Sequence, residues 1–524
     1  MRRGAAIAIA LVMLSASAGA AKAPTAEQAY KLIHEWRIDE ADRAVKTLEA
    51  AHPHDPDVAF LEGELLFLHG HYDEAAARLG DAAAHARSGP GGDEVRGMRD
   101  LARATAEATR GFVSTRGKHF VIWHQPGKDA LLAPYALDAL EKAYQALGDD
   151  FGDRPSEPVR VEIYPEVSDL AKVSTLTLKE IETSGTIALC KFNRVMIVSP
   201  RALLTGYPWL DTLNHEYTHF IVSRTSHNTV PIWLHEGLAK YEERRWRGPH
   251  ETTGGLTPTM EHLLATGLAN HHLITFEQMH PSMAKLPSQE DTALAFAEVY
   301  MVVDYLNTRV GWDGIRKVIA GLKSGDSDAQ AVARVVGKPF DQFQRDWRGW
   351  LRTRKLRAHP GLKPTELKFR KGKASASEDD SGDIGEERAR KLARLGGMLR
   401  ARHRLRAAAV EYEKAQAIAG ADNPQIANKL ARTWLELGDA GRAIAAAEPA
   451  LELYPDQAGP NATLGAAWLD KGDDGKAEKY LDQAISISPF DPAPHCGLQK
   501  IYQQKNDPRK QREADACRLL GGGP

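Results

Sequence analysis

Cysteine is scarce in this sequence, and its scarcity argues against one class of zinc protein. The chain has three cysteines, Cys190, Cys496 and Cys517, among 524 residues. None has a partner at metal-ligand spacing, so a closed, cysteine-rich structural zinc site is not expected. We expect all three cysteines to be structural. Cys496 and Cys517 fall near the end of the chain and could pair, although the sequence does not decide whether they do.

An excess of charge of one sign is also missing. Lys and Arg together number 68 and Asp and Glu 70, so the formal net charge is −2. Nucleic-acid-binding proteins usually carry a strongly basic surface. The composition therefore gives no case for a nucleic-acid partner, and the short basic cluster at residues 244–247 is interpreted as a solvated face.

Long hydrophobic runs are missing too, apart from one near the start of the chain. Arg2 and Arg3 precede a short apolar stretch over residues 5–14, and residues 18–20 are small enough for a cleavage site. This order is typical of a secretory signal peptide, and the stretch is too short for a membrane anchor. We therefore expect a signal peptide over residues 1–20, export to a bacterial periplasm or out of the cell, and no membrane span after cleavage. An uncleaved anchor is the alternative.

Two histidines and an acid stand close together in the middle of the chain. Positions i and i+4 of a helix share a face, so His215 and His219 can bind one metal ion, while Glu216 can reach toward its open position. Catalytic zinc sites usually take three protein ligands and leave the fourth position to water. Glu236, seventeen residues beyond His219, is the obvious third ligand.

The segment around Glu236 has the signals of a second helix. Asn228 and Pro231 mark a turn, and apolar residues recur at helical spacing from Ile232 to Tyr241. Two antiparallel helices joined by a short loop would bring Glu236 back to the histidines. The alternative is a buried helix whose histidines are satisfied by hydrogen bonds. That alternative leaves unexplained an acid inside an apolar segment, where an unpaired carboxylate is costly.

These segments resemble the gluzincin metallopeptidases, and more closely the bacterial peptidase MA-like domains. The resemblance covers about residues 113–355. It includes a pair of strands before the metal helix and two later helices, at residues 183–188, 195–200, 297–311 and 343–351. It implies three zinc (Zn²⁺) ligands and a general base, which are His215, His219, Glu236 and Glu216.

The resemblance also implies hydrolysis of a peptide bond by zinc-activated water. Glu216 would take the proton of that water and pass it to the leaving amine. Gluzincins generally stabilise the oxyanion with a side-chain donor; Tyr300 on the later helix is our candidate, and a core tyrosine with a local partner is the alternative. Glu242 or Glu243 is expected to hold a ligand histidine. His235 adjoins Glu236 and is expected to point away from it, either beside the metal ligands or at the surface rather than as a ligand.

One motif of the aminopeptidases in this clan is missing. These enzymes carry an acid before the metal helix that anchors the free amine of the substrate, whereas residues 184–188 read Ser-Gly-Thr-Ile-Ala. We therefore expect an endopeptidase, whose extended substrate could add as a strand beside residues 194–198.

Repeats flank this central region. Asp39-Glu40-Ala41 recurs as Asp73-Glu74-Ala75, and Trp434-Leu435 recurs as Trp468-Leu469, each thirty-four residues later. That period is typical of the tetratricopeptide repeat (TPR), a pair of antiparallel helices. We expect about two such units near the start of the chain and three or four near its end. Repeat arrays usually present surfaces that bind peptides or proteins.

Between the repeats, residues 119–123 and 159–164 read as strands and residues 133–147 as a helix. Residues 365–388 are polar with little apolar content, which predicts a flexible linker. The predicted fold is an α+β zincin-like domain flanked by all-α helical-hairpin repeats, predominantly helical overall. The predicted divisions are a signal peptide at 1–20, TPR-like repeats at 21–112, a peptidase MA-like domain at 113–358, a linker at 359–387 and TPR repeats at 388–524.

The function that these features favour is an exported zinc metallopeptidase, with peptide or protein substrates and with protein partners recruited by the repeats. The alternative is a catalytically weak or inactive repeat scaffold of the cell envelope. His215, Glu216, His219 and Glu236 are all intact, which argues against a dead site.

Overall fold

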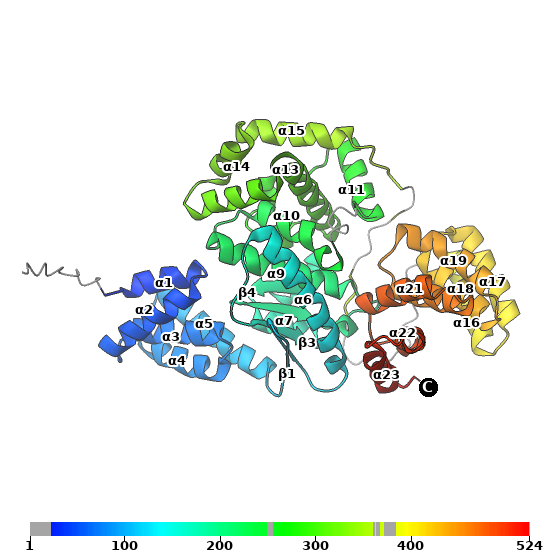
Figure 1. Cartoon of the computed structure of the whole chain (residues 1–524), viewed down its shortest axis with the longest axis horizontal. Helices are drawn as coiled ribbons and strands as arrows, with labels where there is room; N and C mark the ends of the chain where they lie inside the picture. Colours follow the sequence, from blue (N-terminus) through cyan, green and yellow to red (C-terminus); the bar gives the residue numbers. More distant parts are fainter. Residues whose placement is uncertain (1–22, 249–254, 360–361, 363–366, 371–383, 523–524) are drawn as a thin grey trace, which may run out of the picture.

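Three blocks of structure follow one another along the chain in the computed structural model (Figure 1). Residues 23–248, 255–359, 362, 367–370 and 384–522 are described here. The predicted signal peptide lies outside these residues. Within the described residues, no helix combines the length and the apolar character needed to cross a membrane.

The first block is a set of helical hairpins. The helices are α1 (Ala26–His34), α2 (Ile38–Ala51), α3 (Pro56–Leu68), α4 (Tyr72–His85) and α5 (Pro90–Ala108). Ala41 in α2 and Ala75 in α4, which are thirty-four residues apart, are both fully buried. Small side chains at these points allow the helices to pack closely, so the repeated Asp-Glu-Ala segment marks equivalent positions in successive hairpins.

The central block contains one five-stranded sheet. Its strands are β1 (Val113–Arg116), β2 (Phe120–His124), β3 (Val159–Tyr164), β4 (Ala188–Lys191) and β5 (Arg194–Val198), in the order β1-β2-β3-β5-β4. β2, β3 and β5 run parallel, and β1 and β4 are antiparallel strands at the two edges. The predicted strands at 119–123 and 159–164 are confirmed. The predicted helix at 133–147 is the middle of α6 (Leu132–Phe151).

The strand pair expected at 183–188 and 195–200 differs from prediction at its first member. Thr183 and Ser184 end the short helix α8 (Leu178–Ser184), which begins with a capping box between Thr177 and Glu180. Gly185 then closes the helix with a φ of 73°, a conformation that glycine adopts without steric cost. Only Ala188 of the predicted segment therefore lies in β4.

Helices cover both faces of the sheet. α6 and α9 (Trp209–Ser226) lie side by side over one face, and α7 (Val167–Val173) contacts β3 and β5. The later helices of this block are α10 (Ile232–Glu242), α11 (Pro258–Ala269), α12 (Phe276–Met279), α13 (Gln289–Lys323), α14 (Asp328–Val336) and α15 (Phe340–Thr353). α13 and α15 correspond to the two later helices expected from the sequence.

The N-terminal hairpins dock on the sheet through a buried carboxylate. Glu162 of β3 is fully buried, and its oxygens lie 3.0 Å from Arg194 Nε and 2.5 Å from Arg160 Nε. The hydroxyl of Tyr72, from α4, also donates to this carboxylate. Burial alone would raise the pKa of Glu162, but the two guanidinium groups hold it below its usual value. The buried charge is thus paired, and one of its partners comes from the repeats.

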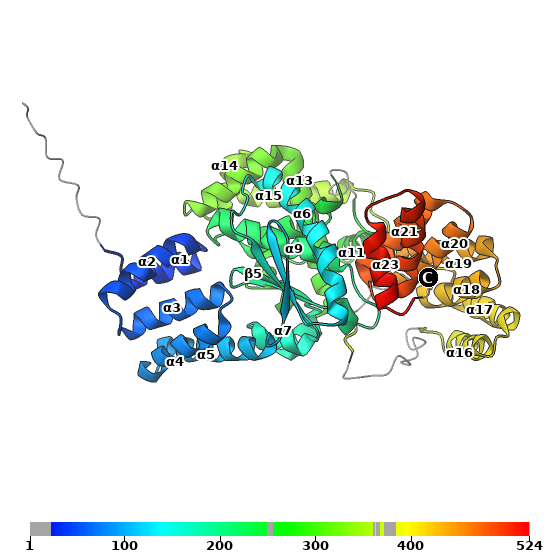
Figure 2. The same ribbon diagram turned by 60° about the horizontal axis from the view of Figure 1, so that its bottom comes forward.

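The last block consists of eight helices in four hairpins. They are α16 (Glu387–Ala401), α17 (Leu405–Ala419), α18 (Pro424–Glu436), α19 (Ala440–Leu453), α20 (Ala458–Asp470), α21 (Asp474–Ile487), α22 (Pro492–Gln504) and α23 (Lys510–Leu519). Apolar residues of α21, α22 and α23 belong to the same hydrophobic core as the central block. Figure 2 shows the sheet between the two sets of hairpins.

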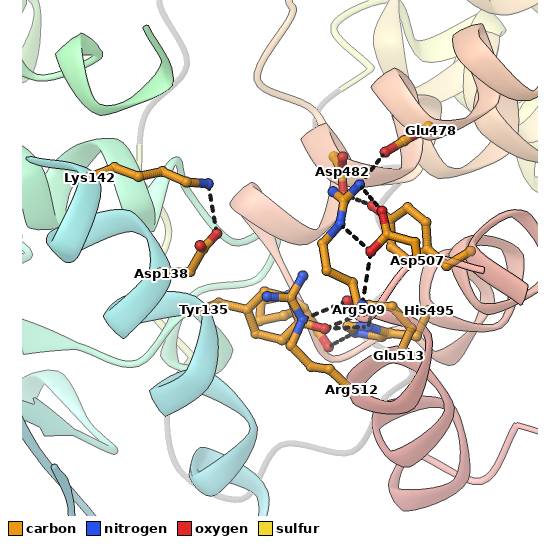
Figure 3. A network of polar contacts seen from close by, with 12 residues as sticks. Tyr135, Asp138, Lys142, Glu478, Asp482, His495, Asp507, Arg509, Arg512 and Glu513 are labelled. Carbon is orange, nitrogen blue, oxygen red and sulfur yellow. Dashed lines mark hydrogen bonds and ion pairs between the residues drawn. The ribbon is translucent and has the colours of Figure 1, made fainter. Parts of the chain in front are cut away.

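A second buried polar network joins the final hairpin to α6 (Figure 3). The Tyr135 hydroxyl of α6 donates to Glu513 Oε2 of α23 at 2.7 Å, and His495 Nδ1 of α22 lies 2.8 Å from the same oxygen. The disulfide between Cys496 and Cys517 links α22 to α23 beside this network. The predicted fold class is confirmed, since an α+β domain lies between all-α hairpin repeats in a predominantly helical chain.

Replacing Tyr72 by Phe removes one donor from the buried Glu162 carboxylate. Hydrogen bonds to charged groups contribute about 1.5–3 kcal/mol, so we expect the Tyr72→Phe variant to unfold at a clearly lower urea concentration than the parent. Tyr30→Phe is the matched control, because the Tyr30 hydroxyl donates at 2.7 Å to Glu94, which is exposed. Equal urea midpoints for the parent and Tyr72→Phe would contradict the proposed role of this contact.

Candidate metal centre

Two antiparallel helices bring the predicted ligands together. α9 is almost entirely buried, and His215 and His219 lie one turn apart on it. The chain leaves α9 at His227, which has a positive φ of 57°, and enters α10 directly after Pro231. α10 packs back against α9. This return places Glu236 beside the two histidines.

The three donor atoms form a nearly regular triangle. His215 Nε2 lies 3.1 Å from His219 Nε2, and Glu236 Oε2 lies 3.5 Å from the first nitrogen and 3.3 Å from the second. Ligand atoms about 2.0–2.1 Å from a tetrahedral zinc ion are about 3.3 Å apart. The separations of these atoms therefore fit a zinc ion held by all three residues.

Glu216 lies beside this triangle. A Glu216 carboxylate oxygen is within 4.8 Å of the donor nitrogens of His215 and His219. Burial raises the pKa of the Glu216 carboxyl, and the backbone N–H of Cys190 in β4 donates to it. The Glu216 carboxylate therefore lies next to the donor nitrogens of both histidines.

Glu243 lies beside the Nδ1 atom of His215, the ring nitrogen that is not part of the triangle. Its Oε2 lies 3.8 Å from His215 Nδ1, and Lys240 Nζ lies 2.7 Å and 2.8 Å from its two oxygens. Burial opposes a charged Glu243, but Lys240 holds the pKa of this carboxyl at about 2. Glu242, the other acid considered, is buried instead beside Asp150. Of the two, Glu243 is therefore placed to orient His215.

The electrostatics of the cluster favour a cation. Burial would lower the pKa of His215, but Glu236 and Glu243 raise it to about 9. Burial would also raise the pKa of Glu236, but the His219 and His215 imidazoles hold it well below its usual range. The negative charge around His215 therefore favours a bound proton. The same charge favours a divalent cation in place of that proton.

Of the two places expected for His235, the structure shows the one beside the ligand histidines rather than the one at the surface. Its ring stacks on His219 with 4.4 Å between the ring centroids, and its Nε2 lies 3.3 Å from Ser223 Oγ. Burial lowers the pKa of His235 to about 3, so the ring is neutral and retains one N–H donor. His235 directly precedes Glu236 on α10. Because α10 packs against both α9 and α13, the His235 side chain meets α9 rather than solvent.

A cavity of about 410 Å³ opens over the triangle. Besides the four residues named by the motif, β4 supplies Cys190, α10 supplies His235 and Lys240, and α13 supplies Phe296 to its wall, together with Glu243, which directly follows α10. Lys240 follows Glu236 by one helical turn and so shares its helix face, which is a signal that the sequence carries. Phe296 and the β4 residues had no such signal, because they enter the site only through tertiary packing.

Tyr300, the predicted oxyanion donor, lies outside this cavity. It is on α13 but faces a separate hollow lined by Asp304, Trp350 and Arg354, and its ring packs on Tyr241 at 5.5 Å between centroids. Phe296, one helical turn earlier on the same side of α13, lines the cavity over the donor triangle instead. The helix is predicted correctly, but the residue of that face that reaches this cavity is Phe296 rather than Tyr300.

The expected place for a substrate strand also needs correction. β5, residues 194–198, is hydrogen-bonded to β3 on one side and to β4 on the other, so nothing can be added beside it. β4 is the edge strand, and Ala188, Leu189 and Cys190 of β4 line the cavity. The available edge is therefore one strand farther out than predicted.

Part of the predicted linker also reaches the cavity. Leu367 lines it, and the Leu367 N–H donates to Gln289 Oε1 at 3.2 Å. Residues 367–370 pair with residues 202–204, where Leu204 N–H donates to Lys368 O at 3.0 Å. This short stretch is held against the central domain, while most of the predicted linker lies outside the described residues.

Comparison with known proteins supports a peptidase-type central domain. The sequence profile of the Peptidase MA superfamily matches residues 139–353, which include α9 and α10. The comparison with curated proteins gives no match.

Three solved structures are similar to parts of the chain. MamA is 17% identical, covering 25% of this chain and 75% of its own, with a TM-score of 0.23. A thermophilic TPR protein in Thermus thermophilus is 23% identical, with coverage of 25% and 72% and a TM-score of 0.23. Native leukotriene A4 hydrolase from Saccharomyces cerevisiae is 13% identical, with coverage of 78% and 67% and a TM-score of 0.30. At these TM-scores the likenesses do not bear on the function.

Replacing Glu236 by Ala should abolish zinc binding, because two histidines alone leave the ion short of a protein ligand. We expect about one zinc per chain in the parent protein and almost none in Glu236→Ala, measured by elemental mass spectrometry after dialysis. Glu182→Ala is the matched control, because Glu182 is exposed on α8 nearby. Zinc retained in full by a folded Glu236→Ala variant would rule out Glu236 as a ligand.

Proposed function

We propose that this protein is a zinc metallopeptidase of the gluzincin type that hydrolyses peptide bonds within a polypeptide. The observation that carries the proposal is the triangle of His215, His219 and Glu236 donor atoms, 3.1–3.5 Å apart, with the Glu216 carboxylate beside it. The Peptidase MA superfamily match supports the proposal because it spans both helices that carry these residues.

Each residue of the centre has a distinct role in this reaction. His215, His219 and Glu236 would hold the zinc ion, which when bound lowers the pKa of water toward about 7 and polarises the scissile carbonyl. Glu216 takes the proton of the attacking water and then donates it to the nitrogen of the leaving amine. Its burial suits this task, because a raised pKa helps a carboxylate to hold the proton between the two steps.

Two other side chains in the cavity can assist. His235 and Lys240, both on α10, line the cavity and carry N–H donors. We assign to them, in place of Tyr300, the stabilisation of the oxyanion that forms on the scissile carbonyl. Glu243 keeps Lys240 in place and also orients His215. One acid therefore positions both an oxyanion donor and a metal ligand.

The substrate is proposed to lie as an extended strand along β4. This strand is at the edge of the sheet, its residues line the cavity, and its Cys190 N–H already points to Glu216. A polypeptide added there satisfies its backbone groups on the sheet edge. No acid stands at residues 184–188 to anchor a free amine, which favours an endopeptidase.

Export by residues 1–20 and selection of substrates or partners by the TPR repeats complete the proposal. Both rest on the sequence, through the order of charged, apolar and small residues at the start and through the thirty-four-residue period of the repeats.

The Glu216→Gln variant tests the reaction. We expect it to bind zinc as the parent does but to cleave a proteome-derived peptide library about 10²–10⁴-fold more slowly, since this is the range that general acid–base catalysis contributes. Cleavage products are measured by mass spectrometry, with Glu182→Gln as the control. The same products at the same rate from Glu216→Gln would contradict peptidase activity at this centre. A folded parent protein without zinc or cleavage would instead favour a repeat scaffold.

A further inference from the structure

A second and larger cavity adjoins the metal centre. It measures about 940 Å³ and lies between the central domain and the C-terminal repeats, where its wall includes residues of α9, α10, α19 and α21. The two cavities share five wall residues, which are Thr212, Lys240, Glu243, Phe296 and Leu367. The cavity over the donor triangle and the cavity beneath the repeats therefore lie side by side.

The charges on the central-domain wall of this second cavity are paired with one another. Lys240 Nζ lies 2.7 Å from Glu243, and Arg247 Nε lies 2.8 Å from Asp211. Arg244 is 3.9 Å from the same aspartate. Each acid on this wall thus has a cation beside it, and the wall offers little net charge to a ligand.

The wall formed by the repeats is different. It carries four acids, Glu448, Glu452, Asp456 and Asp482, against the single cation Lys479. Among the described residues, none of the four acids forms an ion pair. Asp456 accepts one hydrogen bond from Gln483 at 3.4 Å, and Asp482 accepts one from Tyr502 at 3.5 Å. Neither of these partners is charged.

Three of the four acids lie close together at one end of α19. Glu448 and Glu452 are four residues apart on α19 and so share a helix face, and Asp456 follows the end of that helix. Solvent reaches the Asp456 side chain, yet the surrounding protein and the Asp211 carboxylate raise its pKa to about 6. A cation in this cavity would relieve the repulsion between these carboxylates.

We propose that the two cavities form one substrate groove and that the acids of the repeat wall bind Lys or Arg side chains of the polypeptide, on one side of the bond to be cleaved. This inference rests on the proposed peptidase function and names the substrate class of the same site. Electrostatic complementarity supports it, because carboxylates without an ion pair line a cavity that shares five wall residues with the cavity over the metal centre. The repeats then select substrates by contributing a wall of the active-site groove.

The test compares the full-length parent with the double variant Glu452→Gln/Asp456→Asn on the proteome-derived peptide library. For the parent we expect Lys and Arg to be enriched at a fixed position relative to the cleaved bond. The double variant should lose this enrichment, with kcat/KM for a Lys peptide relative to its Gln analogue falling about tenfold. The matched control is Glu413→Gln/Asp470→Asn, which neutralises two exposed repeat acids outside the cavity wall and should leave the enrichment unchanged.

A binding experiment separates this inference from the peptidase proposal. In the Glu216→Gln background, a fluorescent Lys-containing decapeptide should bind more tightly than its Gln analogue, and the difference should vanish in the double variant. This outcome would support the groove even if no hydrolysis were found anywhere. Equal binding of the two peptides to the Glu216→Gln protein would overturn the inference even if hydrolysis were established. Calcium binding that is lost in the double variant, together with equal peptide binding, would overturn it in favour of a cation site.

Discussion

The crossing of α9 and α10 is the constraint on which the rest of the structure depends. Two imidazoles and a carboxylate must approach one another within 3.5 Å inside the protein, and helices that carried them at other angles would leave a buried charge without a partner. The Asn214 amide donates to the backbone carbonyl of Glu242, so the start of the motif is tied to the end of α10. Gly237 is required beside Glu236 because a Cβ there would lie 2.7 Å from Val303 of α13.

The flanking repeats are attached to this centre through buried polar groups as well as apolar surface. The Tyr72 hydroxyl of the first repeats donates a hydrogen bond to Glu162 of the sheet, and the Tyr135 hydroxyl of α6 donates one to Glu513 of the last hairpin. A buried carboxylate that loses its partner is strongly destabilising. These contacts therefore define where each array sits relative to the sheet, which apolar packing alone would specify less sharply.

The C-terminal repeats are bonded directly to the helix that carries the two histidines. Trp209, at the start of the metal helix, donates through its indole N–H to the carbonyl of Ile485 on α21 at 3.1 Å. Tyr207 donates from its backbone N–H to Ile487 O, also at 3.1 Å. The metal helix and the repeats are thus bonded within a few residues of the motif. The same contacts hold α21, which supplies part of the wall of the second cavity, against the start of α9.

Much of the fold could be predicted from local signals. The strands at 119–123 and 159–164, the helix at 133–147 and the two helices of the motif were predicted from alternation, helical spacing and turn residues, and the structure has them. The segment at 183–188 was predicted as a strand although a capping box at Thr177 and a glycine at 185 mark a short helix there. Both cap signals are visible in the sequence, so a short helix could have been predicted there without the structure.

The sequence by itself determined the chemistry that is available, because residue type and helical spacing specify which donors can share a face: His215 with His219, Glu216 beside them, and Glu236 on the following helix. Only the tertiary structure decided which neighbours complete the centre. Tyr300 lies one helical turn past the cavity that Phe296 lines, Glu243 rather than Glu242 lies beside His215, and β4 rather than β5 is the open edge. The position of a cavity along a helix and the order of strands in a sheet depend on packing among elements far apart in the chain, which no local pattern encodes.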